Sequence, residues 1–254
     1  MILMYHIIAD AACRAESPYA VSPGKFQWQM RYLKYRGYTP VGMDGLCELL
    51  TGRANAPKRP LVITFDDGYM DNYEEAFPVL KEFGFPATFF IISGLAGQTN
   101  RWDIVNGFRE RRLMGWREIG ELQRYGMTIG AHTVNHCMLN RVPEETASRE
   151  VGECKRQLED RLGTLVDHFA YPYGALNESI MDLVKSAGYR SACSVEPGSN
   201  TTSTHLFRLR RSMVCGTDRI WHFVRQVRHT KENRKLETRG GGANRRECPR
   251  YSKR

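Results

Sequence analysis

The sequence predicts an α/β fold built on a parallel β-sheet. Short apolar runs typical of buried strands alternate with longer helical segments along the first 230 residues. The runs are rich in β-branched and aromatic residues, as in Leu61 to Phe65, and several end directly in a residue that can do chemistry. No Gly-x-Gly-x-x-Gly turn follows a strand, which disfavours a dinucleotide-binding sheet.

The first half of the chain alternates between strands and helices with clear boundary signals. Ser22 precedes Pro23, the favoured pair of an N-cap and a first helical residue, and Gly84 is a helix stop. Asp44 and Asp71 are expected to begin helices. In chain order we expect a strand at 1–5, a helix at 22–36, a short link or strand at 37–41, a helix at 44–50, a strand at 61–65, a helix at 71–83 and a strand at 87–92.

The second half continues the alternation after one long connection. The segment 93–113 is predicted to be a loop, and its length suggests that it borders a functional groove. Then follow a helix at 116–125, a strand at 127–131, a helix at 143–162, a strand at 167–171, a helix at 177–187, strands at 189–195 and 207–214, and a helix at 217–229.

The positive charge of the chain is concentrated at its end. Residues 225–254 hold eleven Lys or Arg and three Glu, which is +8 of the net charge of +9. Residues 231–254 contain few apolar side chains, so we expect a disordered basic tail after one folded domain at 1–230. The tail lacks interleaved aromatic residues and any nucleic-acid motif, so nucleic acid is not an expected partner.

Other compositional features bound the class of protein. The seven cysteines include no Cys-x-x-Cys pair, so neither a disulfide scaffold nor a zinc knuckle is expected. No apolar run reaches 18 residues, so no transmembrane helix is expected. Because Met1 to Tyr5 already reads as a strand, the sequence as it stands predicts a cytoplasmic location, or export if a targeting segment precedes it. The oligomeric state is left open.

Two groups of potential metal ligands follow predicted strands. Asp66 and Asp67 come directly after the strand at 61–65, and His132 and His136 follow the strand at 127–131. Each group alone has a simpler interpretation, as a turn or a chance pair. Adjacent buried carboxylates are costly unless a cation meets them, and imidazole with carboxylate suits zinc or a similar first-row ion. In a β/α barrel both groups would lie at the carboxyl edge of the strands, where active sites collect.

These motifs, with three further segments, resemble the polysaccharide deacetylase family, the NodB-homology domain of carbohydrate esterase family 4. The quoted segments are Thr64-Phe65-Asp66-Asp67-Gly68-Tyr69, His132-Thr133-x-x-His136, Met4-Tyr5-His6, Pro86-Ala87-Thr88-Phe89-Phe90 and Phe169-Ala170-Tyr171-Pro172-Tyr173-Gly174. The resemblance covers roughly residues 1 to 228 and implies a distorted (β/α) barrel of about seven parallel strands.

The resemblance also implies roles for the four residues. Asp66 is expected to be the catalytic base, and Asp67, His132 and His136 are expected to bind one divalent metal ion, zinc in the first place, with cobalt and nickel also compatible. Three protein ligands leave positions open for water and substrate, which is the pattern of catalytic sites.

Further residues follow from the same resemblance. A subgroup that acts on poly-N-acetylglucosamine uses the His of an N-terminal Tyr-His segment as general acid, which corresponds here to His6. Tyr69 and Tyr173 are expected to bind substrate, Tyr173 through a backbone N–H that holds the oxyanion. Many members carry an Arg that orients the catalytic Asp where this chain has Ala170, a loss shared with that subgroup; Arg210 or Arg211 is a candidate replacement.

The expected function is therefore metal-dependent removal of N-acetyl groups from a glycan that contains N-acetylglucosamine. A carbohydrate O-acetyl esterase is the nearest alternative, and a non-catalytic glycan-binding domain is an alternative of another class. A zincin-type metallopeptidase is disfavoured because Thr133 stands where the His-Glu-x-x-His motif has Glu.

Overall fold

Seven parallel strands form a curved sheet with the spatial order β7-β6-β5-β4-β3-β1-β8, and a short additional strand, β2, pairs with β3. The computed structural model describes residues 1–228, so the predicted tail at 231–254 lies outside the described residues. The strands are β1 (Ile2–Tyr5), β2 (Thr39–Pro40), β3 (Pro60–Phe65), β4 (Thr88–Ile91), β5 (Thr128–Ala131), β6 (His168–Ala170), β7 (Ser191–Cys193) and β8 (Ser212–Met213). The predicted parallel sheet is confirmed.

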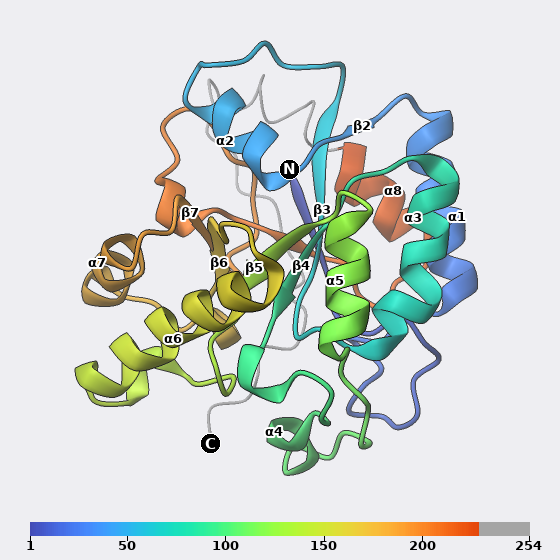
Figure 1. The fold of residues 1–254 in the computed structure, drawn as a ribbon. Coiled ribbons are helices and arrows are strands. Elements are labelled where there is room, and N and C mark those ends of the chain that lie inside the picture. Colours follow the sequence, from blue (N-terminus) through green and yellow to red (C-terminus); the bar gives the residue numbers. More distant parts are fainter. Residues whose placement is uncertain (229–254) are drawn as a thin grey trace.

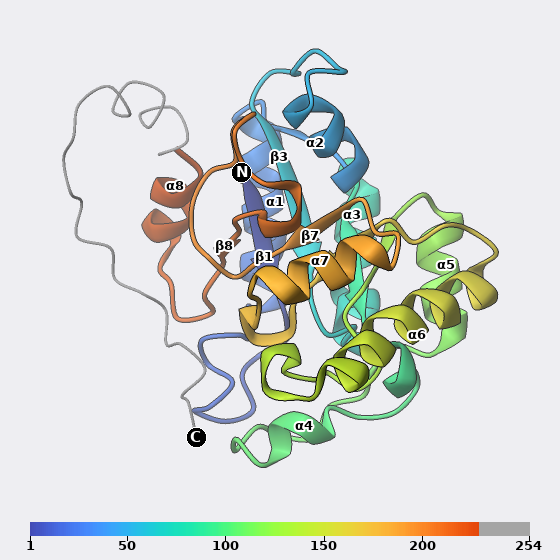
Figure 2. The same cartoon turned by 90° about the vertical axis from the view of Figure 1, so that its left-hand side faces the viewer.

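Helices surround the strands, and α2 and α4 lie at opposite ends of the barrel (Figure 1). One end carries α2 and the other carries α4, while α1 and α8 lie side by side on the outside in both views (Figures 1 and 2). The helices are α1 (Pro23–Tyr35), α2 (Met43–Leu50), α3 (Phe77–Phe83), α4 (Arg101–Ile104), α5 (Trp116–Arg124), α6 (Glu144–Leu162), α7 (Glu178–Ser186) and α8 (Ile220–Arg228). Within residues 1–228, no helix has the length and apolar character needed to cross a membrane.

Alternation along the strands separates two packed surfaces. One buried cluster includes Ile2, Val62 and Phe90 with Met43 and Leu46 of α2, and it fills the inside of the curved sheet. The residues next to them on the same strands belong to the larger cluster under the outer helices. Because successive side chains of a strand point to opposite faces, residue 66 follows Val62 and Thr64 onto the inner face. The first carboxylate of the Asp pair is thereby directed into the barrel.

The predicted strand at 207–214 is confirmed only in part, as the short strand β8 (Ser212–Met213) and a single bridge at Leu209. It begins as a 3-10 turn (Leu206–Arg208), pairs with β7 through Leu209, and then pairs with β1 as β8. A straight strand could not pair with both edges of the sheet, so the chain crosses from one edge to the other. The crossing closes the barrel and places Arg211 inside it, fully buried.

Two other segments differ from the predictions. The helix expected at 71–83 begins with a π-helical turn (Asn72–Ala76) in which the Phe77 N–H donates to the Asn72 carbonyl, and Pro78, which has no N–H, follows in the first turn of α3. The expected loop at 93–113 contains α4 and two antiparallel bridges, Thr99 with Arg112 and Tyr69 with Leu113. The second bridge attaches this segment to the residues that follow β3.

Candidate active site

The residues singled out from the sequence lie together at the carboxyl edge of the sheet. His6 follows β1, Asp66 and Asp67 follow β3, and His132 follows β5. The register pairs Tyr5 with Phe65, so the residues after β1 and β3 are neighbours. In parallel α/β sheets this edge is where catalytic residues gather, because loops there can face one another across the strand ends.

Asp67, His132 and His136 form a compact cluster that can hold a metal ion. Their ligand atoms all lie within 4.8 Å of one another. The Nε2 atoms of His132 and His136 lie 3.3 and 3.2 Å from Oδ1 of Asp67. All three side chains are buried, with at most 5% of their surface exposed. Burial raises the pKa of Asp67, but the adjacent His136 and His132 hold it well below its ordinary value.

The other ring nitrogens show that the two histidines fit a metal. Nδ1 of His132 lies 2.7 Å from the carbonyl oxygen of Ala170, which can only accept, so Nδ1 must carry the hydrogen. Nδ1 of His136 lies 3.0 Å from the hydroxyl of Tyr173. With Nδ1 protonated, the neutral ring of His132 turns an Nε2 lone pair toward a carboxylate oxygen. Two acceptors so placed require a proton or a cation between them, and this donor set is the one that zinc-like ions prefer.

The backbone at this edge is held in an uncommon conformation. Five described non-glycine residues have a positive φ, and four of them belong to the motifs: Asp67 (72°), Thr133 (64°), His136 (58°) and Tyr173 (59°). Each such residue costs on the order of 1–3 kcal/mol, and such residues cluster at functional sites. The surrounding contacts must therefore define the positions of these side chains.

Asp66 forms a two-point ion pair with Arg211, which lies 145 residues later in the chain. Nη1 and Nη2 of Arg211 lie 2.6 and 2.7 Å from Oδ1 and Oδ2 of Asp66, and Nε of Arg211 donates to the Ser194 carbonyl at 2.9 Å. Burial raises the pKa of Asp66, but Arg211, together with His132 and His6, more than offsets this and leaves it below its ordinary value. Of the two arginines considered from the sequence, Arg211 makes the contact and Arg210 is exposed.

His6 is held at the rim by the residues that follow the Asp pair. Its carbonyl accepts from Nδ2 of Asn72 at 2.7 Å. Two residues later, the backbone N–H of Ile8 donates to Asp71 at 2.8 Å. Its ring meets Tyr19 edge-on at 5.4 Å, and the residue is 9% exposed. Burial lowers the pKa of His6, while the charges of Asp67 and Asp66 act in the opposite direction.

The two predicted substrate-binding tyrosines differ in exposure. Tyr173 is partly exposed and packs on His136, with ring centroids 4.5 Å apart. Tyr69 is 1% exposed, and its hydroxyl donates to Asp103 at 3.3 Å, so it lies in the wall behind the site. Its predicted contact with substrate would require that wall to open.

Trp102 and Asp103 were missed in the sequence, although the length of their segment was noted. The Trp102 ring lies 4.7 Å from the His136 ring, on α4. Asp103 is fully buried, and burial, helped by the negative charge of Asp67, raises its pKa to about 7. The sequence offers only a Trp followed by an Asp in a long connection after a strand. That pattern does not distinguish residues that line a site from residues of a surface turn.

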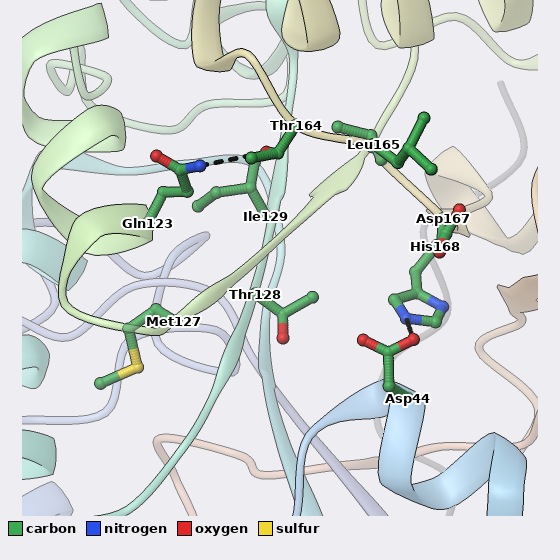
Figure 3. Close-up of a pocket in the computed structure, with 10 residues that line it drawn as sticks. Asp44, Gln123, Met127, Thr128, Ile129, Thr164, Leu165, Asp167 and His168 are labelled. Atoms are coloured by element: carbon green, nitrogen blue, oxygen red, sulfur yellow. Dashed lines mark hydrogen bonds and ion pairs between the residues drawn. The ribbon is translucent and has the colours of Figure 1, made fainter.

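A cavity of about 180 Å³ lies at the opposite edge of the sheet (Figure 3). There His168, at the start of β6, points toward Asp44 of α2 with Nε2 and Oδ1 3.2 Å apart, and its Nδ1 lies 2.9 Å from the Ser191 hydroxyl. Ser191 is fully buried, so this chain of polar contacts ties α2 to the sheet and exposes no nucleophile. The late histidines His205 and His222 also lie outside the cluster.

Comparison with known proteins agrees with this arrangement. A Staphylococcus aureus protein named poly-beta-1,6-N-acetyl-D-glucosamine N-deacetylase is 25% identical over 217 residues, covering 82% of this chain and 72% of that protein. A Bacillus subtilis protein named as a polysaccharide deacetylase is 27% identical over 213 residues, covering 84% and 70%. A Streptococcus pyogenes deacetylase solved with acetate has the same fold, with a TM-score of 0.78 and 23% identity over 89% of this chain and 96% of that one.

The family assignment rests on the match of more than half of the chain. Residues 53–192, which include β3, β4, β5, β6 and both metal-ligand motifs, match the sequence profile of the family described as Polysaccharide deacetylase. The chain therefore belongs to the polysaccharide deacetylase family.

Proposed function

We propose that this protein removes N-acetyl groups from a polysaccharide containing N-acetylglucosamine, and that it needs one divalent metal ion to do so. The observation that carries the proposal is the buried cluster of Asp67, His132 and His136 next to Asp66, a carboxylate kept ionised by Arg211. The substrate class is supported by the name of the Staphylococcus aureus relative.

Asp67, His132 and His136 would hold the ion, and zinc suits their one-oxygen, two-nitrogen donor set. When bound, such an ion makes water easier to deprotonate and polarises a carbonyl group. The protein prepares the ligands in advance. Ala170 and Tyr173 accept or share the outer ring hydrogens, which keeps both Nε2 atoms directed at Asp67.

Asp66 is assigned as the general base that accepts a proton from the attacking water. Both of its oxygens are bonded to Arg211, which fixes the carboxylate plane and favours the ionised form. Each oxygen keeps a second lone pair, so the ion pair with Arg211 still leaves Asp66 able to accept a hydrogen bond from water. In this environment the Asp66 carboxylate is a weak base, which suits a water molecule whose own pKa is lowered.

His6 is assigned as the general acid that protonates the leaving amine. An amide needs this more than an ester does, because an amine is the poorer leaving group, so the presence of His6 favours N-deacetylation over O-deacetylation. Burial lowers the pKa of His6, and the charges of Asp67 and Asp66 oppose this effect. A proton accepted by Asp66 would therefore lie near the imidazole that has to donate one.

The test is acetate release from β-1,6-linked N-acetylglucosamine oligomers, compared with an O-acetylated xylan. Each substrate is tested with the untreated protein, after treatment with chelator, and after zinc is added back. We expect release from the N-acetylated oligomer, loss with chelator, and recovery with zinc. Release from the O-acetylated glycan alone would establish the esterase, and tight oligomer binding without release by the zinc-loaded protein would establish a binding domain.

A further inference from the structure

The five residues that carry both histidines, 132–136, are contacted from the outside by a buried carboxylate that the proposed chemistry does not use. This is Glu150 of α6, which is 7% exposed. Its Oε2 accepts the backbone N–H groups of Val134 and Asn135, each at 2.9 Å. Its Oε1 accepts from Nδ2 of Asn135 at 2.7 Å. Three donors of one short loop therefore converge on one side chain.

The opposite side of the same loop is held by the residues after β4. The N–H groups of Ser93 and Gly94 donate to the carbonyls of Thr133 and Val134, at 3.2 and 3.0 Å. A Cβ on Gly94 would lie 2.6 Å from the Val134 oxygen, so only glycine permits this approach. The loop is thus held between β4 and α6, and Glu150 is the charged group that accepts from its backbone.

The loop needs these partners because its backbone N–H groups cannot find acceptors within the loop itself. Thr133 and His136 are both left-handed, so residues 132–136 form neither a strand nor a helix, and the N–H groups between them have no regular partner. A carboxylate that accepts several N–H groups gives shorter and stronger bonds than a neutral acceptor. Glu150 thereby supplies the partners that the backbone between the two histidines lacks.

We infer that Glu150 is a positioning residue for the metal site, acting through the loop backbone to hold His132 and His136 at the ligand spacing. The inference rests on the proposed metal dependence. Partners that orient metal ligands typically change metal affinity by about 10–100-fold when they are lost. Glu150 touches neither ring, so its effect must travel through the N–H groups of Val134 and Asn135.

The first experiment measures Co²⁺ affinity by competition with a chromophoric chelator, together with the visible absorption of the bound Co²⁺. Glu150→Leu removes every acceptor that the loop uses at this position and keeps a side chain of similar size. We expect about 10–100-fold weaker Co²⁺ binding and an altered spectrum. Glu145→Leu is the matched control, because Glu145 is exposed on the same helix, and it should bind Co²⁺ like the wild type.

A rescue experiment separates positioning from a general loss of stability. Glu150→Gln is the rescue, because its amide oxygen can accept the N–H groups of Val134 and Asn135 while Asn135 turns its own oxygen toward the introduced NH2; it should keep most of the affinity and the wild-type spectrum. If Glu150→Leu fails to fold, Asn135→Ala, which keeps Glu150 and removes one bond, should give a smaller loss. The N–H groups of Val134 and Asn135 should exchange with solvent faster in Glu150→Leu, while those of β5 do not.

The outcomes are distinguishable. Wild-type affinity and spectrum in Glu150→Leu, or an affinity loss without faster exchange at Val134 and Asn135, would overturn the positioning role alone. No Co²⁺ binding by the wild type would overturn the proposed metal dependence and the positioning role with it.

Discussion

Arg211 and Asp66, 145 residues apart in the chain, form a two-point ion pair inside the barrel, with N–O distances of 2.6 and 2.7 Å. Both side chains are almost fully buried, at 0% and 2% exposure. Ala170 stands where the family resemblance leads one to expect an arginine near the catalytic Asp, and Arg211 contacts Asp66 instead. Arg211 belongs to the segment that closes the barrel, so closure of the fold and the orientation of the Asp66 carboxylate depend on the same few residues.

Replacing Arg211 by lysine should separate the charge from the geometry. Arg211→Lys keeps a cation but loses the fork that holds both carboxylate oxygens, and misplacement of a catalytic group by about 1 Å can cost roughly 100-fold in rate. We expect kcat to fall by about that factor with little change in KM, and the acid limb of the pH–rate profile to move to higher pH, because the pKa of Asp66 is held down by Arg211. Arg210→Lys, at an exposed position, is the control and should match the wild type.

Asp66→Asn should keep the metal and lose at least about 100-fold in turnover, because the base is gone. The variant should also be less stable by about 3–5 kcal/mol, since it leaves the Arg211 charge buried without its partner. Urea unfolding measures this, and Asp66→Asn combined with Arg211→Met should recover stability without recovering activity. Turnover within a few-fold of wild type in Asp66→Asn would remove Asp66 from the role of base.

His132→Ala should lose metal and turnover together. Its Nε2 lies 3.3 Å from Asp67 and its ring is fixed by the Ala170 carbonyl; among residues 1–228, Asp67, His132 and His136 are the residues grouped closely enough to hold an ion here. Metal content after dialysis, read by atomic emission, is the measurement. His205→Ala, which changes a histidine outside the cluster, should retain full metal content; stoichiometric metal in His132→Ala would contradict the assigned ligand set.

His6→Ala should retain the metal and lose turnover with amide substrates, by about 100-fold or more. The sign of its pH effect follows from its role: an acid must be protonated, so activity falls as pH rises through the pKa of His6, which burial lowers. The variant should lose this basic limb. With p-nitrophenyl acetate, whose leaving group needs no proton, the loss should be small. Equal losses on both substrates would point to a structural role for His6.

Asp103→Asn should change how stability depends on pH. Burial raises the pKa of Asp103 from 3.8 to about 7, so the folded state binds this proton more tightly than the unfolded chain. The resulting stabilisation is complete below the unfolded pKa and is lost as pH rises toward about 7. In chelator-treated protein, the free energy of unfolding of Asp103→Asn should rise relative to wild type by about 2.5 kcal/mol between about pH 5 and about pH 8. An equal difference at both pH values would show that Asp103 does not titrate there.

Local patterns in the chain predicted the sheet, its parallel direction and the elements around it. Apolar runs ending in Asp66, His132 and Tyr173 predicted strands because buried strands have that composition, and glycine and proline marked most helix ends. The same patterns predicted that these residues share one edge, because every parallel strand ends there. Their geometry agrees with this, while their chemical roles stay predictions.

Tertiary structure decided everything that depends on pairs distant in sequence. Only the folded chain shows that Arg211 and not Arg210 reaches Asp66, because the choice depends on where the closing segment crosses from β7 to β1. It likewise decided that Trp102 packs on His136 and that Glu150 holds the histidine loop. Such contacts leave no periodic signal in a sequence, since they arise where the barrel brings remote loops together and buried polar groups must find partners.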